Sequence, residues 1–174
     1  MDLSQTIFEL IDMRSFSNLW FWIALAVFWS SASHWVLGVP WDSVLRAKRN
    51  GGQAEIDLQD LVRINSNRLL HIIDVSGLFL IGFTFFILTG LAGVGFAYNV
   101  EFAQAVFLLL FPMSIVSMLS IRVARRIRAD SPTGEELRKR LARHRFWVQL
   151  IGMISIFVTS LWGMFQNFQI SPLG

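Results

Sequence analysis

The chain has 174 residues and a formal net charge of +3; 54% of its residues are hydrophobic and only 16% are charged. A soluble domain of this length would have too little polar surface to cover so much apolar side chain, since about 25% of residues in an average soluble domain are charged. Cysteine is absent, which excludes a disulfide framework, a thiolate metal site and thiol chemistry.

Four apolar stretches are each long enough to cross the hydrocarbon core of a bilayer, which takes roughly 20 helical residues. Because backbone polar groups must be satisfied within lipid, each stretch is expected to be helical. The sequence therefore predicts an all-α polytopic membrane protein, a single membrane domain over 1–174. Its transmembrane helices are expected at 19–37, 75–98, 102–121 and 146–168.

The basic residues are sorted along the chain. Fourteen of the fifteen Lys and Arg residues lie in 41–71 or 122–145, and Arg14 is the exception. Cationic loops stay on the cytoplasmic side during insertion. We therefore expect both segments to be cytoplasmic loops, both termini to be periplasmic, and the protein to lie in the bacterial inner membrane. Charge sorted in this way favours anionic lipid head groups over nucleic acid as the partner.

The N-terminal tail and the first basic loop carry helix signals. Residues 1–18 have apolar side chains on one helical face, which predicts an interfacial helix on the periplasmic leaflet. In the loop, Asp42 or Ser43 could cap a short helix that Gly51-Gly52 ends. The helical pattern that resumes at Gln53 is expected to continue into the second span without a break.

The second basic loop is also expected to be helical. The third span continues as a basic helix to Arg128, and Ser131-Pro132 should break it. Thr133 and Glu136 have the spacing of a capping box, which predicts the start of a new helix that runs into the fourth span.

His34 and Asp74 are the candidate polar pair of the membrane domain. Both are expected at a similar depth near the inner surface of the membrane. There, contact with the carboxylate would let the histidine take up and release protons. The alternatives are structural. Asp74 would pair with Arg68 or with Arg122, and His34 would join Ser30 in hydrogen bonds between helices.

We predict no metal and no cofactor. His34 and His71 could in principle ligate a b-type haem from two helices, but no matching histidine pair lies deeper in the spans. His144 stands between two arginines, and we expect it to be solvated or to face lipid.

Small residues recur within the spans at spacings that let helices approach closely. We expect helix packing through these positions: Ala26, Ser30, Gly90, Gly93, Ser155, Thr159 and Gly163. Pro112 should kink the third span.

Three functions remain open. The first is an accessory or scaffolding subunit, without catalysis, of a larger inner-membrane complex, respiratory or photosynthetic, held by other integral membrane subunits. The second is a small proton-coupled transporter or channel that uses His34 and Asp74. The third is a lipid-acting membrane enzyme. Lipid head groups are expected to contact nine basic residues: Arg46, Lys48, Arg49, Arg122, Arg125, Arg126, Arg128, Arg143 and Arg145.

Three stretches of the chain resemble a family of small bacterial inner-membrane proteins. They are Ile11-Asp-Met-Arg-Ser-Phe-Ser-Asn-Leu-Trp20, Ala32-Ser-His-Trp-Val-Leu-Gly-Val-Pro40 and Asp60-Leu-Val-Arg-Ile-Asn65. Members of that family carry the description of a component of the iron–sulfur cluster assembly (Suf) complex. The resemblance implies an inner-membrane location and carries over no catalytic residue.

Overall fold

The computed structural model describes residues 15–170, and the expected interfacial helix therefore lies almost wholly outside the described residues. The described chain is helical except for a two-stranded hairpin and short turns. Its elements are η1 (Ser15–Ser17), α2 (Leu19–His34), β1 (Trp35–Val36), β2 (Val39–Pro40), α3 (Trp41–Asn50), α4 (Gly52–Ala92), η2 (Gly93–Ala97), α5 (Glu101–Asp130) and α6 (Gly134–Ile170).

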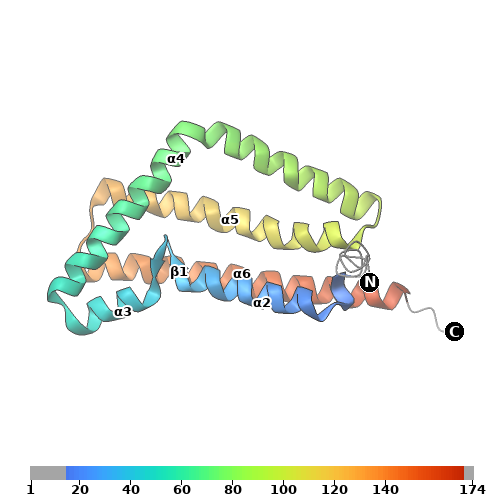
Figure 1. Cartoon of the computed structure of the whole chain (residues 1–174), viewed down its shortest axis with the longest axis horizontal. Helices are drawn as coiled ribbons and strands as arrows, with labels where there is room; N and C mark the ends of the chain where they lie inside the picture. Colours follow the sequence, from blue (N-terminus) through green and yellow to red (C-terminus); the bar gives the residue numbers. More distant parts are fainter. Residues whose placement is uncertain (1–14, 171–174) are drawn as a thin grey trace, which may run out of the picture.

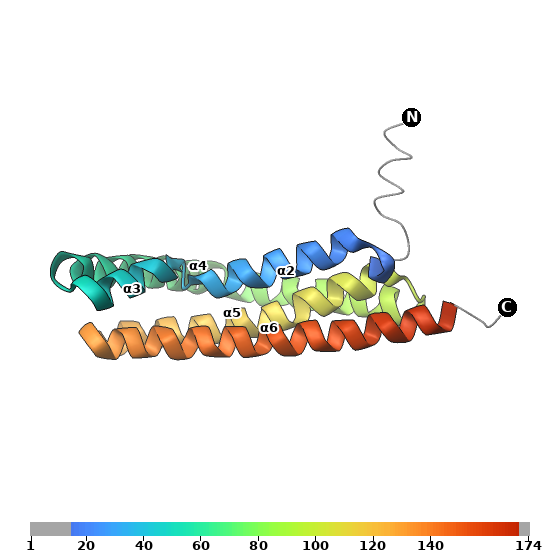
Figure 2. The ribbon, with the colours of Figure 1, turned by 90° about the horizontal axis from the view of Figure 1, so that it is seen from below.

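The long helices extend along one common direction (Figure 1). α3, the start of α4 and the turn between α5 and α6 lie at one end of the molecule, which we call the charged end. η1, η2 and the end of α6 lie at the other. Figure 2 shows α2 running beside α6 in the opposite direction. The two basic segments are thus gathered at one end although fifty residues, 72–121, separate them in the sequence.

Within residues 15–170, three helices are long and apolar enough to cross a membrane: the helix that begins at Gly52, α5 and α6. α2 is shorter than predicted. Its 16 residues span about 24 Å, against a hydrocarbon core of about 30 Å. The predicted helix over 19–37 is wrong at its inner end, because the chain leaves the helix at His34 and turns into the hairpin.

The hairpin turns tightly at Leu37-Gly38, where both residues have positive φ, 51° and 73°. Two successive residues of positive φ are typical of the hairpin turns whose twist matches the strands. A leucine rarely adopts this conformation. The turn places Val36 and Val39 in the core of the charged end, where both are fully buried, and burial of these side chains offsets the strain at Leu37.

Helix boundaries in the basic segments mostly follow the sequence signals. α3 ends at Gly51-Gly52, both of positive φ, and α4 then runs into the second span without a break, as expected. The expected cap was wrong. Pro40 is the N-cap of α3 without a side-chain hydrogen bond, because the helix begins early enough to put Asp42 in its first turn.

The later boundaries agree with the sequence as well. α5 ends at Asp130, Ser131 adopts the left-handed conformation, and α6 begins at Gly134. The second span differs, since its last turn is a π-helix, η2, and not an α-helix.

Two separate apolar clusters hold the bundle together. At the charged end, nine buried residues from the hairpin and from α3, α4, α5 and α6 form one core, centred on Val39, Leu58 and Leu141. When water surrounds such a core, the hydrophobic effect drives its formation. In the apolar body, Leu25 and Trp29 of α2 pack against Val116 and Val148. Within lipid that contact depends on close fit instead.

α4 bends near its middle, and its second half leaves the bundle (Figure 1). The central stretch contains Ser76-Gly77, a pairing found at helix kinks. Residues 75–92, here called the α4 arm, stand away from α5 until η2 returns the chain to it. α4 and α5 are therefore close together at η2 and stand apart along the arm (Figure 1).

A buried glutamine closes the end of the arm. The Gln104 side chain donates hydrogen bonds to the Gly95 carbonyl at 2.8 Å and to Asn99 Oδ1 at 3.2 Å, and it accepts one from Trp162 Nε1 at 2.9 Å. A Cβ at Gly95 would lie 2.9 Å from the backbone nitrogen of Gln104, so only glycine permits this approach. The π-helical turn is thus fixed to both α5 and α6.

Candidate functional site

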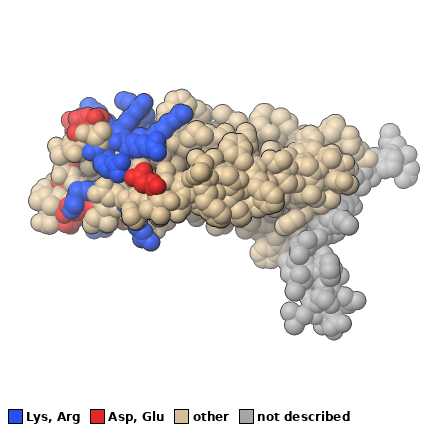
Figure 3. All heavy atoms as spheres, turned by 90° about the horizontal axis from the view of Figure 1, so that it is seen from above, with Lys and Arg blue, Asp and Glu red and all other residues tan. Residues whose placement is uncertain are grey.

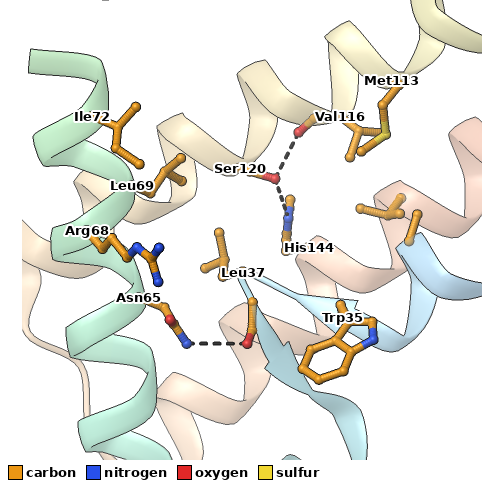
Figure 4. A pocket seen from close by; sticks show the side chains of 13 residues that line it. Trp35, Leu37, Asn65, Arg68, Leu69, Ile72, Met113, Val116, Ser120 and His144 are labelled. Carbon is orange, nitrogen blue, oxygen red and sulfur yellow. Dashed lines mark hydrogen bonds between the residues drawn. The ribbon is translucent and has the colours of Figure 1, made fainter. Parts of the chain in front are cut away.

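A pocket of about 400 Å³ lies where α2, the hairpin, α4, α5 and α6 meet (Figure 4). It sits between the core of the charged end and the apolar body. Polar side chains lie on two opposite sides, and the remaining lining is apolar. Its lining consists of Ala32, Trp35, Leu37, Gly38, Asn65, Arg68, Leu69, Ile72, Met113, Val116, Ser120, His144 and Val148.

The α4 side of the pocket carries Asn65 and Arg68, one helical turn apart. Asn65 Nδ2 donates to the Gly38 carbonyl at 3.3 Å, which fixes the hairpin turn against α4. In Figure 4 the Arg68 guanidinium points from α4 into the pocket. Arg68 has no ion pair or hydrogen bond within the described part of the chain, and the predicted pairing of Arg68 with Asp74 is absent there. Arg68 is thus a cation with no carboxylate partner in its pocket.

The opposite side is built on His144, which is only 4% exposed. The expectation that His144 faces solvent or lipid is wrong, because α6 turns this position towards α5. His144 Nε2 lies 3.1 Å from Ser120 Oγ, whose hydrogen goes to the Val116 carbonyl at 2.9 Å. With its only hydrogen used in this way, the hydroxyl can accept but not donate again.

His34 and Asp74 have different partners. His34 Nε2 lies 3.8 Å from an Asp42 carboxylate oxygen, and Asp74 lies 3.8 Å from Arg128 NH1. All four side chains are at least half exposed. Over residues 15–170 no hydrogen bond joins His34 to Asp74, so the structure does not bring the candidate pair together. Asp74 does pair with an arginine, as the structural alternative predicts, but that arginine is Arg128 and not Arg68 or Arg122.

The candidate head-group residues divide into two sets. Arg145 is used within the chain, since its Nε donates to the Ser33 carbonyl at 3.1 Å and its guanidinium lies 4.5 Å from the centre of the Trp41 ring. Arg46 pairs with Asp42 at 3.7 Å, and Arg128 with Asp74. Six are exposed and have no ion pair among the described residues: Lys48, Arg49, Arg122, Arg125, Arg126 and Arg143.

Figure 3 shows how these charges are distributed. On the face in view, Lys, Arg, Asp and Glu gather at one end, and the rest of that surface is uncharged. The boundary between the two regions marks the depth at which a membrane surface would lie.

Some of the predicted helix-packing positions are buried against other helices, and others are exposed. Ser155 and Thr159 are buried, and a Cβ at Gly163 would lie 3.4 Å from Phe16 and Trp22. Ala26 and Ser30 are exposed on α2. Gly90 and Gly93 have nothing within 4 Å of where a Cβ would be, so the described chain does not use them for close packing.

Sequence reasoning missed the close contact of Gly152 with Trp29 and the pocket itself. A Cβ at Gly152 would lie 2.8 Å from the Trp29 ring, so this glycine admits the indole between α2 and α6. The pocket had a faint signal: Met113, Val116 and Ser120 follow helical spacing and end in a polar residue.

No group of three or more His, Cys, Asp or Glu residues within 15–170 could hold a metal ion. His71, the second residue of the haem alternative, is exposed on α4. The pocket is thus the site with the most varied chemistry in the described chain.

Comparisons of the chain with protein-family models, with curated proteins and with solved structures each returned no match. The resemblance to the Suf-labelled membrane family stays a prediction.

Proposed function

We propose that α2, α4, α5 and α6 all cross the bacterial inner membrane, with the charged end in the cytoplasm. The sorting of charge to one end supports this arrangement, because basic segments are retained on the cytoplasmic side. α2 is short for a span, yet it runs beside α6 and packs Leu25 and Trp29 into the apolar body. Flanking residues and local thinning of the bilayer accommodate a short span at modest cost.

Within this membrane we propose an accessory, scaffolding role: the protein binds a transmembrane helix of another integral membrane subunit along the α4 arm. The observation that carries the proposal is the isolation of the arm. Leu78 is 89% exposed and Phe86 is 74% exposed, and most apolar side chains between them are also exposed. Lipid could cover these large side chains, so they do not by themselves require a protein partner.

The glycines of the arm favour a helix over lipid as the occupant. Gly82 and Gly90 have nothing within 4 Å of where a Cβ would be. Glycine costs a helix interior about 1 kcal/mol relative to alanine, and lipid gains nothing from its lack of a side chain. A second helix does gain, since small residues let two backbones approach. The arm therefore has the surface that a neighbouring transmembrane helix requires.

Gentle-detergent purification followed by crosslinking and mass spectrometry tests this role. We expect a reproducible integral membrane partner crosslinked to the arm. Gly82→Leu and Gly90→Leu should each reduce its recovery about tenfold, since a bulky side chain blocks the approach of a helix. Ile81→Leu is the matched control, because it changes an exposed arm residue without filling a glycine position.

A monodisperse monomer with no reproducible partner would contradict the proposal. So would a partner whose recovery is the same in both glycine variants and in the control. A complex made only of copies of this chain would replace the proposed subunit partner with self-association. The separate partners of His34 and Asp74 give the transporter alternative no comparable support.

A further inference from the structure

We propose that the pocket at the junction of α2, the hairpin, α4, α5 and α6 binds one phospholipid, with Arg68 on the phosphate and an acyl chain along the apolar wall. Given the orientation proposed above, this lipid belongs to the cytoplasmic leaflet. Binding itself depends neither on that orientation nor on the scaffolding role, so the two proposals can fail separately.

Charge points to an anionic ligand. Arg68 is the one Lys or Arg in the lining, and no Asp or Glu lines the pocket with it. The carboxylate nearest along α4, Asp74, lies beside Arg128 instead. A guanidinium offers a planar set of donors that matches two oxygens of a phosphate. A phosphate in the pocket would give Arg68 the partner that residues 15–170 do not supply.

The rest of the lining suits a hydrocarbon chain. Ser120 and His144 hydrogen-bond to each other, and the Ser120 hydrogen is used by the Val116 carbonyl, so this polar pair adds no free hydroxyl donor to the wall. Ile72, Met113 and Val148 supply apolar surface around it. A ligand that meets both surfaces must have an anionic head and an apolar tail, as a phospholipid does.

The location and the size of the pocket agree with this ligand. The lining joins Arg68 of the basic segment to Met113 and Val148 of the apolar stretches, so the pocket lies at the boundary between the charged and uncharged regions. Figure 3 shows that boundary, which is the depth of lipid phosphates when the uncharged body is in the membrane. Trp35, 54% exposed, stands on its rim, and tryptophan is enriched at this depth. The volume of about 400 Å³ falls within the range of roughly 300–1,000 Å³ seen for small-molecule sites.

The hairpin supplies the remaining wall. Leu37, in its left-handed conformation, lines the pocket, and Asn65 holds the turn in place through the Gly38 carbonyl. The strained turn thus closes a cavity that a continuous helix through 37 would not form.

Native mass spectrometry of the full chain in mild detergent, titrated with phosphatidylglycerol, tests the proposal. We expect one lipid to bind to the wild-type protein, and Arg68→Gln to weaken that binding about tenfold, the effect of losing one charge-assisted hydrogen bond. Arg125→Gln is the matched control. It removes an exposed arginine that lies outside the pocket and has no described ion pair, and binding should stay within about twofold of wild type.

Two further measurements test the role of the apolar wall and the source of the phosphate. Ile72→Trp, at an exposed position of the lining, should weaken lipid binding by a similar factor without loss of charge. Inorganic phosphate alone should bind at least about tenfold more weakly than the lipid, because it lacks the acyl chain. Unchanged circular dichroism and elution volume verify that each variant is folded.

Equal losses in Arg68→Gln and Arg125→Gln would overturn the proposal in favour of diffuse attraction to the whole basic end. Unaltered binding in Ile72→Trp would show that no acyl chain lies along this wall of the pocket. Inorganic phosphate that binds as well as the lipid would make this a site for a soluble anion.

Discussion

Ser155 of α6 donates a hydrogen bond to the carbonyl oxygen of Leu108 of α5, across 3.4 Å. Leu108 precedes Pro112 by four residues, so its carbonyl would normally accept the amide hydrogen that proline lacks. Water cannot satisfy this carbonyl inside a membrane. A hydroxyl from the neighbouring helix therefore takes the place of the missing backbone donor, and the small-residue face of α6 has a chemical as well as a steric role.

Replacement of this hydroxyl should destabilise the protein. We expect Ser155→Ala to lower the free energy of unfolding by about 1 kcal/mol, as is typical of a hydrogen bond between membrane helices. In a Pro112→Ala background the restored amide satisfies Leu108, and the cost of Ser155→Ala should fall to near zero. Reversible unfolding in mixed micelles measures both. Equal costs in the two backgrounds would show that the hydroxyl does not substitute for the proline.

The contact of Gly152 with Trp29 gives a steric prediction. Gly152→Ala would place a Cβ 2.8 Å from the indole, and forcing the ring to move should cost about 1–3 kcal/mol of stability. Gly82→Ala is the control, since the space around it is open and alanine is the better helix former. We expect the control to leave the midpoint of thermal unfolding unchanged or to raise it. A Gly152→Ala protein as stable as wild type would mean that the two helices are not in close contact.

Arg145 should matter for stability, whereas its neighbour Arg143 should not. Arg145→Gln loses the hydrogen bond to the Ser33 carbonyl and the contact with the Trp41 ring, and we expect a loss of about 1–3 kcal/mol. Arg143→Gln removes an exposed charge without a described partner and should change stability by less than about 0.5 kcal/mol. Chemical unfolding of the two variants compares them. Similar losses would point to a general effect of positive charge.

Two of the acidic residues that pair with arginines on other helices, Asp74 and Glu55, should differ in how much their ion pairs stabilise the protein. Asp74 and Arg128 are at least half exposed, so Asp74→Asn should cost less than about 1 kcal/mol and leave proton flux into liposomes unchanged. Glu55 and Arg138 form a direct ion pair and are mostly buried, so Glu55→Gln should cost about 2 kcal/mol or more. A drop of proton flux in Asp74→Asn would instead revive the transporter alternative.

Local signals in the sequence located most helix ends. Glycines at 51 and 52 and the Ser131-Pro132 pair each end a helix in the structure because they act on their own backbone. The hairpin at Leu37-Gly38 had no comparable signal. A leucine of positive φ is held by burial of the two valines beside it, and burial depends on helices that arrive later in the chain.

The site was harder to predict, because its residues come from five elements. Arg68 and His144 meet one pocket only because α4 bends and α6 turns its histidine inward. An exposed charged residue such as Asp74 has several possible partners when only the sequence is known. The tertiary structure places Arg128 beside it. Small-residue spacing predicted the packing face of α6 but could not tell which glycines of α4 would lie open.

The sidedness of four positions tests the four-crossing arrangement most directly. The chain has no cysteine, so single cysteines at Asn18, Asn50, Tyr98 and Thr133 can be labelled in intact cells with a membrane-impermeant maleimide. We expect labelling at 18 and 98 from outside, and at 50 and 133 only after the membrane is permeabilised. Labelling of 18 and 50 from the same side would contradict a crossing by α2, and labelling of 133 in intact cells would contradict a cytoplasmic charged end.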